Sequence, residues 1–95
     1  MKLLYFYMRG CKECKRQSEE INCHKPSVDV IRLDVEDADT IRLCKKLRVG
    51  DAPTIVLMKD YDSTMDNETI QKNFVKKWVD FTKVEDINHY ILSVR

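Results

Sequence analysis

Two cysteines, Cys11 and Cys14, are separated by two residues and follow a run of apolar residues. That run, residues 3–8, has the length and the residue types of a buried strand. Residues 12–21 contain no glycine or proline, which favours a helix that begins beside Cys11. The unpaired N–H groups and the positive dipole end at a helix N-terminus stabilise a thiolate. Cys11 is therefore a candidate nucleophile.

The spacing of the two cysteines predicts disulfide exchange. Cys11 would attack a substrate disulfide and form a mixed disulfide, which Cys14, one helical turn further on, would resolve. The pair could instead be half of a zinc site, with Cys23 and His24 as the other ligands. Those four side chains could meet only if the helix between the pair and Cys23 did not form. A formed helix would hold Cys23 roughly 15–18 Å from the helix start.

Length, composition and charge limit the function further. The chain has 95 residues, enough for one domain spanning residues 1–95 with one modest core. It carries 17 Lys and Arg against 16 Asp and Glu, and this net charge of +1 indicates neither a nucleic acid nor a membrane as partner. The first apolar run is too short for a signal peptide, and no run has transmembrane length. We therefore expect a cytoplasmic protein, whose cysteines are free, catalytic or metal-bound rather than structural disulfides.

Further apolar patterns predict the elements that would position the cysteine pair. Residues 28–35 read as a second strand, parallel to the first in a right-handed strand–helix–strand unit. A second helix should begin at Asp37 or Asp39 and run to about residue 48. Its apolar face is expected to consist of Ala38, Ile41, Cys44 and Leu47, with Leu43 beside them. Cys44 would then be a buried and inert thiol.

The second half of the chain predicts a central strand and an edge strand. Residues 54–58 are uniformly apolar, as expected of a strand that is buried on both faces. Residues 59–73 are polar and rich in turn formers, and we expect an irregular connection there. Residues 74–81 predict an edge strand antiparallel to the third, with Val75 and Val79 on the same face.

The predicted order is strand, helix, strand, helix, strand, strand, helix, and the last helix would begin at a capping box of Thr82 and Glu85. This α/β order resembles the thioredoxin fold in its short form, as in glutaredoxins and small thioredoxin-like reductants. The resemblance covers the whole chain and implies a mixed four-stranded sheet flanked by three helices. Three segments carry it: Gly10-Cys11-Lys12-Glu13-Cys14, Asp34-Val35-Glu36-Asp37 and Ala52-Pro53-Thr54.

The resemblance implies a thiol–disulfide oxidoreductase in which Cys11 and Cys14 are catalytic. It implies reduction of protein or small-molecule disulfides by a monomer that needs no cofactor or metal and takes electrons from a thiol or a reductase. In that family the proline is cis and lies against the redox pair, so Pro53 is expected to be cis. The residues expected to shape the substrate site are Gly10, Lys12, Glu13, Ala52, Pro53 and Thr54.

The sequence also departs from the thioredoxin pattern at several positions. Lys12 and Glu13 stand where thioredoxins have Gly-Pro, and Gly10 stands where they have Trp. Thioredoxins keep a buried acid six residues before the first cysteine, and this chain has Tyr5 there. The glycine pair with which glutaredoxins hold glutathione is absent. One alternative is therefore a thioredoxin-like binding module with a vestigial cysteine pair, and a less favoured one is a small zinc protein.

The charges around the pair suggest the kind of substrate. Close to the cysteine pair, the sequence has one carboxylate, Glu13, and four cations: Arg9, Lys12, Lys15 and Arg16. Together they favour a thiolate at Cys11 and a substrate surface that is acidic around its disulfide.

Overall fold

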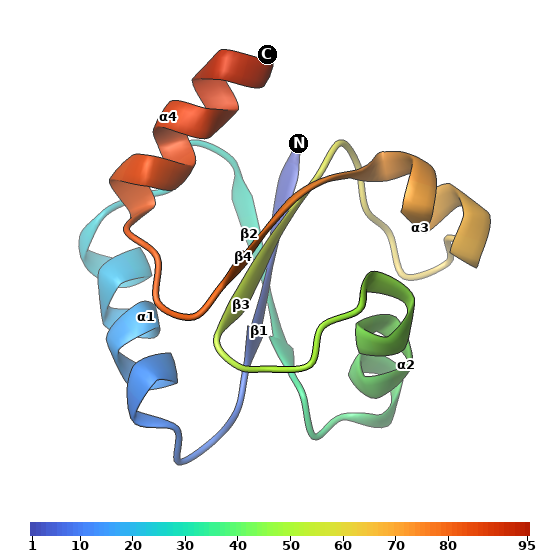
Figure 1. Ribbon diagram of the computed structural model, residues 1–95, viewed down its shortest axis with the longest axis horizontal. Coiled ribbons are helices and arrows are strands. Elements are labelled where there is room, and N and C mark those ends of the chain that lie inside the picture. Colours follow the sequence, from blue (N-terminus) through green and yellow to red (C-terminus); the bar gives the residue numbers. More distant parts are fainter.

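A four-stranded sheet runs through the middle of the molecule, with helices on both of its faces (Figure 1). The computed structural model describes all 95 residues. Strands and helices alternate along the chain in the following order: β1 Lys2–Tyr7, α1 Lys12–Cys23, β2 Asp29–Asp34, α2 Ala38–Leu47, β3 Thr54–Met58, α3 Asn67–Asn73, β4 Phe74–Val79 and α4 Val84–Val94.

The strands lie in the order β2-β1-β3-β4. β1 pairs parallel to β2, with Lys2 opposite Asp29, whereas β1 with β3 and β3 with β4 pair antiparallel. The predicted mixed sheet, with an apolar central third strand and the fourth strand at an edge, is therefore confirmed. The uninterrupted apolar residues of β3 are buried throughout, because helices cover the sheet on both sides.

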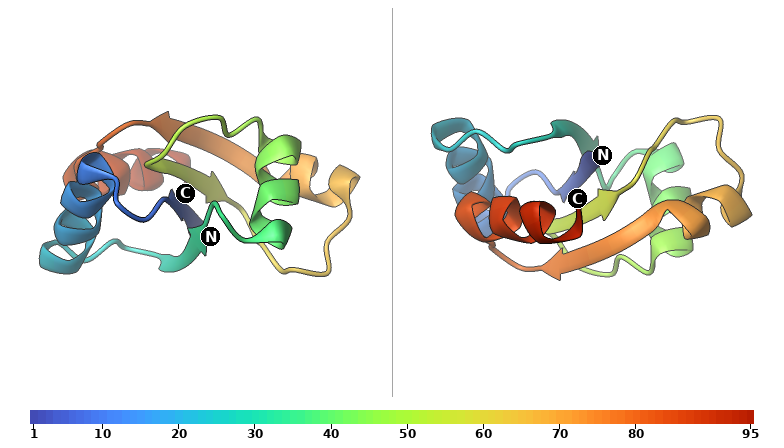
Figure 2. Two further views of the ribbon diagram at one scale, coloured as in Figure 1. Left: turned by 90° about the horizontal axis from the view of Figure 1, so that it is seen from below. Right: turned by 90° about the horizontal axis from the view of Figure 1, so that it is seen from above.

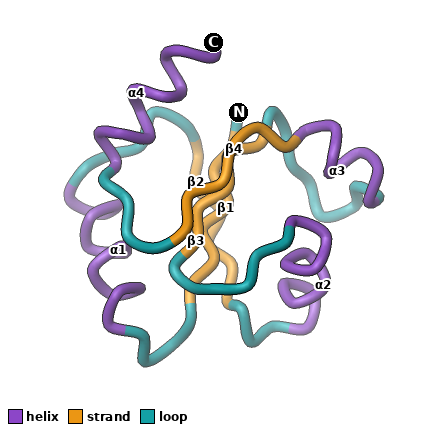
Figure 3. The backbone as a smooth tube through the Cα atoms, viewed as in Figure 1, coloured by secondary structure: helices purple, strands orange, loops and turns teal.

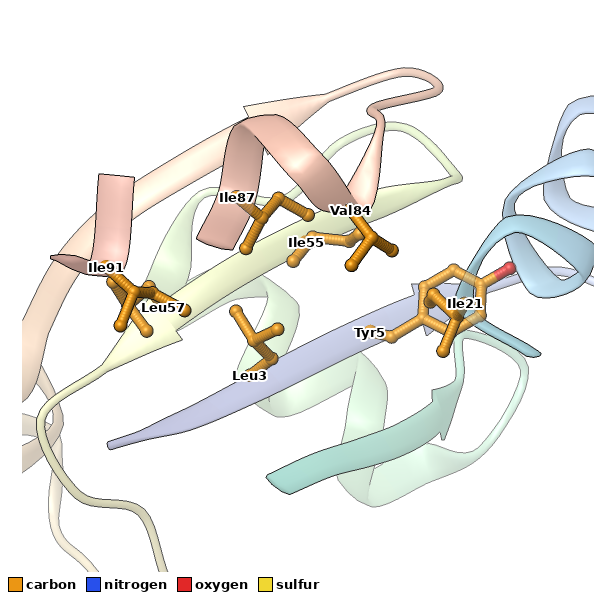
Figure 4. Close-up of a cluster of buried hydrophobic side chains, with 8 residues drawn as sticks. All are labelled: Leu3, Tyr5, Ile21, Ile55, Leu57, Val84, Ile87 and Ile91. Atoms are coloured by element: carbon orange, nitrogen blue, oxygen red, sulfur yellow. The ribbon is translucent and has the colours of Figure 1, made fainter. Parts of the chain in front are cut away.

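Helices α1 and α4 cover one face of the sheet, and α2 and α3 cover the other, as Figures 1 and 2 show. The backbone trace in Figure 3 shows the same three layers. Alternate side chains of β1 point to opposite faces, so Leu3 and Tyr5 belong to one buried cluster and Leu4 and Phe6 to the other. Figure 4 shows the first cluster, in which α4 packs on β1 and β3. None of the four helices is long and apolar enough to cross a membrane.

A short helix occupies part of the segment that the sequence predicts to be irregular. The side chain of Asp66 accepts a 2.8 Å hydrogen bond from the Thr69 N–H and caps α3. Ile70 anchors this helix in the second cluster. Four helices therefore flank the sheet, not the three expected, because a single buried residue and a good cap suffice for a helix of two turns.

The edge strand β4 is shorter than predicted and contains a bulge. It ends at Val79, and its register with β3 shifts between Leu57 and Met58, where Val75 has no partner. The shift lets Val75 pack on the first cluster together with Trp78, while Val79 is 49% exposed. The predicted placement of Val75 and Val79 on one face is therefore wrong.

Helix α2 is capped as predicted but is rotated about its axis. Asp37 caps it by accepting a hydrogen bond from the Thr40 N–H. The side chains that enter the core are those of Thr40, Leu43 and Leu47, whereas Ile41 is 42% exposed. The predicted apolar face is therefore wrong at Ala38 and Ile41, which are exposed. Helix α2 carries more apolar residues than its contact with the sheet can cover.

The predicted capping box at the start of α4 does not form. The N-cap residue is Lys83, whose side chain makes no capping bond. Glu20 of α1 supplies the cap instead, and its carboxylate accepts a 2.8 Å hydrogen bond from the Val84 N–H. The Thr82 hydroxyl bonds to the Asp80 carbonyl, and the Thr82 backbone is held by the side chain of Gln17.

Candidate active site

Cys11 is the N-cap residue of α1 and lies directly after the turn that ends β1. Gly10 forms this turn with φ of +77°, a left-handed conformation that strains residues with a side chain. The Cys11 sulfur accepts a 3.2 Å hydrogen bond from the Cys14 N–H, as a capping side chain does. Its carbonyl accepts the first helical bond, from Lys15. The sulfur of Cys11 thus faces the start of the helix, and the residue is only half-buried, so it remains accessible.

Cys14 lies on the inner side of the first turn and is only 3% exposed. Its sulfur accepts a 3.5 Å hydrogen bond from the Met8 N–H. Burial is the main cause that raises the pKa of Cys14 to about 11, and its side-chain hydrogen bond with Cys11 raises this pKa further. The bond from Met8 acts in the opposite direction because it stabilises the Cys14 thiolate. The two thiols are thus neighbours with different exposure.

The loop before β3 brings Pro53 and its neighbours to the cysteine pair. The Ala52–Pro53 bond is cis, as the resemblance implies. The Ala52 carbonyl accepts a hydrogen bond from the Cys11 thiol at 3.8 Å. Thr54 fixes this loop by donating its hydroxyl to the Asp51 carbonyl at 2.7 Å. Two segments far apart in the sequence therefore meet at the Cys11 sulfur.

Tyr5 lies beneath the first turn of α1 at the position where the thioredoxin pattern has an acid. It is fully buried, and its hydroxyl donates a 2.7 Å hydrogen bond to the Cys14 carbonyl. The Ser18 hydroxyl lies 2.9 Å from the same phenol oxygen and completes its hydrogen bonding. Burial raises the pKa of Tyr5, which keeps the phenol in its neutral, donating form. Tyr5 thus anchors the first turn of α1 without a charge, and Figure 4 shows its hydroxyl pointing toward α1.

Lys12 and Glu13, the two residues between the cysteines, are exposed. Glu13 pairs with Arg16, one turn further on, at 2.7 Å. The Arg16 guanidinium also stacks on the ring of Phe81, 4.3 Å from its centroid. The carboxylate of Glu13 is therefore paired with a cation of the same helix. Lys12 has no ion-pair partner.

Sequence reasoning did not assign the residues after β4 to the site. The Asp80 N–H donates a 3.0 Å hydrogen bond to the Pro53 carbonyl, so this turn borders the Pro53 loop. Asp80 has a positive φ of 67°, and Val79 beside it is exposed. An aspartate at the end of a strand is a weak signal for a turn, and nothing local links it to a proline so far away in the sequence.

A cleft adjoins the cysteine pair on the side of α2, and we call it the α2 cleft. Its volume is about 680 Å³. Its apolar lining consists of Met8, Val35, Ile41, Cys44, Val49 and Ala52. Cys44 is half-buried in its wall, and burial raises the pKa of this thiol, consistent with the predicted inert role.

The zinc alternative is not supported by the geometry. Helix α1 is continuous from Lys12 to Cys23, so Cys23 and His24 lie at the opposite end of the helix from Cys11. No group of three or more His, Cys, Asp or Glu side chains is placed to hold a metal ion. The four predicted ligands therefore do not converge.

Comparison with known proteins identifies the fold. No protein-family model matches this sequence, and no curated protein matches it significantly. The solved structure of thioredoxin from Aeropyrum pernix aligns with a TM-score of 0.69 and 17% identity, covering 99% of this chain and 74% of that one. Thioredoxin 1 from Thermosipho africanus aligns with a TM-score of 0.62 and 16% identity, covering 99% and 93%.

A third similar structure is thioredoxin-2, described as a component of the malaria parasite protein secretion machinery. It aligns with a TM-score of 0.68 and 20% identity, covering 97% of this chain and 81% of that one. The chain therefore has the thioredoxin fold.

Proposed function

We propose that this protein is a thiol–disulfide oxidoreductase that reduces disulfides with the Cys11–Cys14 pair. The observation that carries the proposal is the asymmetry of the pair. One accessible sulfur caps a helix and accepts a hydrogen bond from the Cys14 N–H, while the Cys14 sulfur is buried beneath the same turn. The accessible sulfur at the start of the helix is the one that a substrate disulfide can reach, and the thiolate is the form of a cysteine that attacks a disulfide.

The reaction would proceed in two exchanges. The Cys11 thiolate attacks one sulfur of the substrate disulfide, the substrate S–S bond breaks, and the departing sulfur takes up a proton. Cys14 then loses its proton and attacks the Cys11 sulfur, which forms the Cys11–Cys14 disulfide and releases the second substrate thiol. The substrate gains two electrons and two protons from the enzyme dithiol. A thiol or a reductase, in a reducing compartment such as the cytosol, restores the dithiol.

The surroundings of the pair support these roles. The Met8 N–H can stabilise the Cys14 thiolate while it attacks. Gly10, Ala52, Pro53 and Thr54 would shape the groove in which the substrate disulfide approaches Cys11, with the exposed Lys12 and Glu13 at its edge. We propose that the protein does this as a monomer and without a metal or cofactor.

Reduction of insulin disulfides, followed by turbidity with dithiothreitol as electron donor, tests this proposal. We expect the wild-type protein to accelerate the reduction, and Cys11→Ser to abolish the acceleration because no nucleophile remains. The matched control is Cys23→Ser, which removes an exposed thiol at the far end of α1, outside both the pair and the α2 cleft, and should leave the rate unchanged. If wild-type protein and Cys11→Ser gave equal rates, the proposal would fail and the alternative of a redox-inactive binding module would be supported.

A further inference from the structure

Helix α2 presents a second stripe of side chains to the α2 cleft, beside the residues that enter the core. The stripe consists of Ile41, Cys44 and Lys45, which follow the i, i+3, i+4 spacing of one helix face, and Arg48, the C-cap residue just after the helix, extends it. All four line the α2 cleft. Residues of a stripe whose only role was solubility would be polar throughout. Here a large apolar side chain is left uncovered beside two cations.

The opposite wall of the α2 cleft is in direct contact with both redox sulfurs. Met8 and Ala52 line the cleft. The Met8 N–H donates a hydrogen bond to the Cys14 sulfur, and the Ala52 carbonyl accepts a hydrogen bond from the Cys11 thiol. Met8 is itself 43% exposed, so a second apolar side chain faces the cleft without a cover. Whatever occupies the cleft therefore lies next to the reacting disulfide.

The rim of the α2 cleft is predominantly positive. Neither Lys45 nor Arg48 takes part in an ion pair, and Asp51 is the only carboxylate in the lining. Lys77 extends the positive surface beyond Arg48. Its ammonium group donates a 2.8 Å hydrogen bond to the Arg48 carbonyl. The complement to such a rim is an acidic segment.

We propose that the α2 cleft binds the segment of a protein substrate that flanks its disulfide, and that it selects a large apolar side chain followed by acidic side chains. This inference rests on the proposed function and specifies its substrate class. The apolar side chain lies between Ile41 and Met8, and the acidic side chains meet Lys45 and Arg48. The cleft thereby holds the substrate disulfide against the Cys11 sulfur.

Four synthetic peptides test the proposal. All carry the same internal disulfide, and they combine Leu or Ser beside one cysteine with a following Glu-Glu or Lys-Lys. Second-order rate constants are measured with pre-reduced protein, and each is divided by the same variant's rate with bis(2-hydroxyethyl) disulfide. We expect wild type to prefer the Leu peptide with Glu-Glu over the Ser peptide with Lys-Lys by about tenfold or more, and this preference to weaken with salt.

The variants separate the two parts of the selectivity. Lys45→Glu combined with Arg48→Glu should reverse the preference for Glu-Glu, with a change of about tenfold. Ile41→Ser should remove only the preference for Leu. The matched control combines Lys25→Glu and Lys59→Glu, which make the same change of charge at exposed positions outside the α2 cleft, neither of them near Cys11 or Cys14 in the sequence. This control should keep both preferences.

The outcomes distinguish this inference from the proposed function. If bis(2-hydroxyethyl) disulfide is reduced but all four peptides react alike, the cleft inference is wrong and the oxidoreductase stands. If no disulfide is reduced, the proposed function fails, and calorimetric binding of the same peptides to Cys11→Ser protein decides the cleft preference. A concentration-dependent dimer, lost in Ile41→Ser, would show that a second copy of the chain occupies the cleft and would overturn the inference.

Discussion

At the scale of single residues, the first turn of one helix gives two thiols different chemistry. Cys11 caps the helix and receives a hydrogen bond from the N–H of Cys14. Cys14 lies under the turn, where burial opposes its ionisation. The same turn therefore leaves one sulfur accessible at the start of the helix and keeps the other a buried, neutral thiol.

Cys11 should react first with an alkylating agent. We expect iodoacetamide at about pH 7 to label Cys11 before Cys14, because the first sulfur is accessible and the second is 3% exposed. Peptide mapping by mass spectrometry over a time course measures the order. Cys23 is exposed but has no hydrogen bond that favours its thiolate, so it is the internal control. Faster labelling of Cys14 or Cys23 would show that the roles are wrongly assigned.

The attack by Cys14 should accelerate as the pH rises. With a pKa of about 11, only about one Cys14 in ten thousand is a thiolate at pH 7, and only the thiolate reacts. The rate should therefore rise about tenfold per pH unit and level off only as the pH approaches this pKa. Levelling should come somewhat earlier, because the Cys11 thiol that raises this pKa is consumed in the mixed disulfide.

Dithionitrobenzoate measures this step in protein that carries Cys23→Ser and Cys44→Ser. One equivalent should release a first nitrothiobenzoate anion when Cys11 attacks and a second, slower one when Cys14 resolves the mixed disulfide. Cys14→Ser in the same background should eliminate the second phase. A second phase that stops accelerating below about pH 8 would reveal a base that activates Cys14 and contradict the prediction.

At the scale of elements, α1 is tied to the segment that precedes α4. Gln17 is fully buried, and its side-chain amide donates to the Thr82 carbonyl at 2.9 Å and accepts from the Thr82 N–H at 2.7 Å. Glu20, one turn further on, caps α4. These bonds explain how so polar a helix stays in place with few apolar contacts. They hold the helix that carries the thiols against the fold.

Removing the cap that α1 supplies to α4 should lower stability. We expect Glu20→Ala to reduce the free energy of unfolding by about 1 kcal/mol, because the Val84 N–H loses its acceptor. Glu20→Gln retains an acceptor oxygen and should cost less than half as much. Urea denaturation measures both. Equal losses in the two variants would show that the charge of Glu20, and not the hydrogen bond to Val84, is what stabilises the helix.

The sequence predicted the elements whose patterns are local, and it failed where distant contacts decide. Long apolar runs predicted β1 and β3, because a central strand is buried on both faces wherever it pairs. The local signal for a capping box at Thr82 was overridden by Glu20, 62 positions earlier in the sequence. The bulge at Val75 depends on the register with β3, which no pattern within β4 encodes.

The candidate site was predictable to the same extent. Cys11, Cys14 and Pro53 were singled out because their residue types and spacing are distinctive, and the structure brings the two cysteines and the Pro53 loop together. The α2 cleft was missed because Ile41 and Cys44 were placed on the core face of the helix. An apolar arc wider than one face was already visible in the sequence, and it could have indicated that α2 carries a second surface.

At the scale of the whole molecule, one sheet separates two buried clusters. β1 and β3 supply side chains to both, so neither cluster can form without the strands that also build the other. Helix α1, which carries the cysteine pair, packs on the first cluster, and α2 with its cleft packs on the second. The site therefore lies where two halves of the core meet at one end of the sheet.

This arrangement predicts a single cooperative unfolding transition that either cluster can weaken. Leu43→Ala, in the second cluster, should lower the free energy of unfolding by about 2–5 kcal/mol. Trp78, the only tryptophan, packs on the first cluster, yet its fluorescence should report the same loss as far-UV circular dichroism. Ile91→Ala, in the first cluster, is the matched control and should shift both signals equally. If Leu43→Ala moved the dichroism transition to lower urea while the Trp78 transition stayed in place, the two faces of the sheet would be unfolding separately.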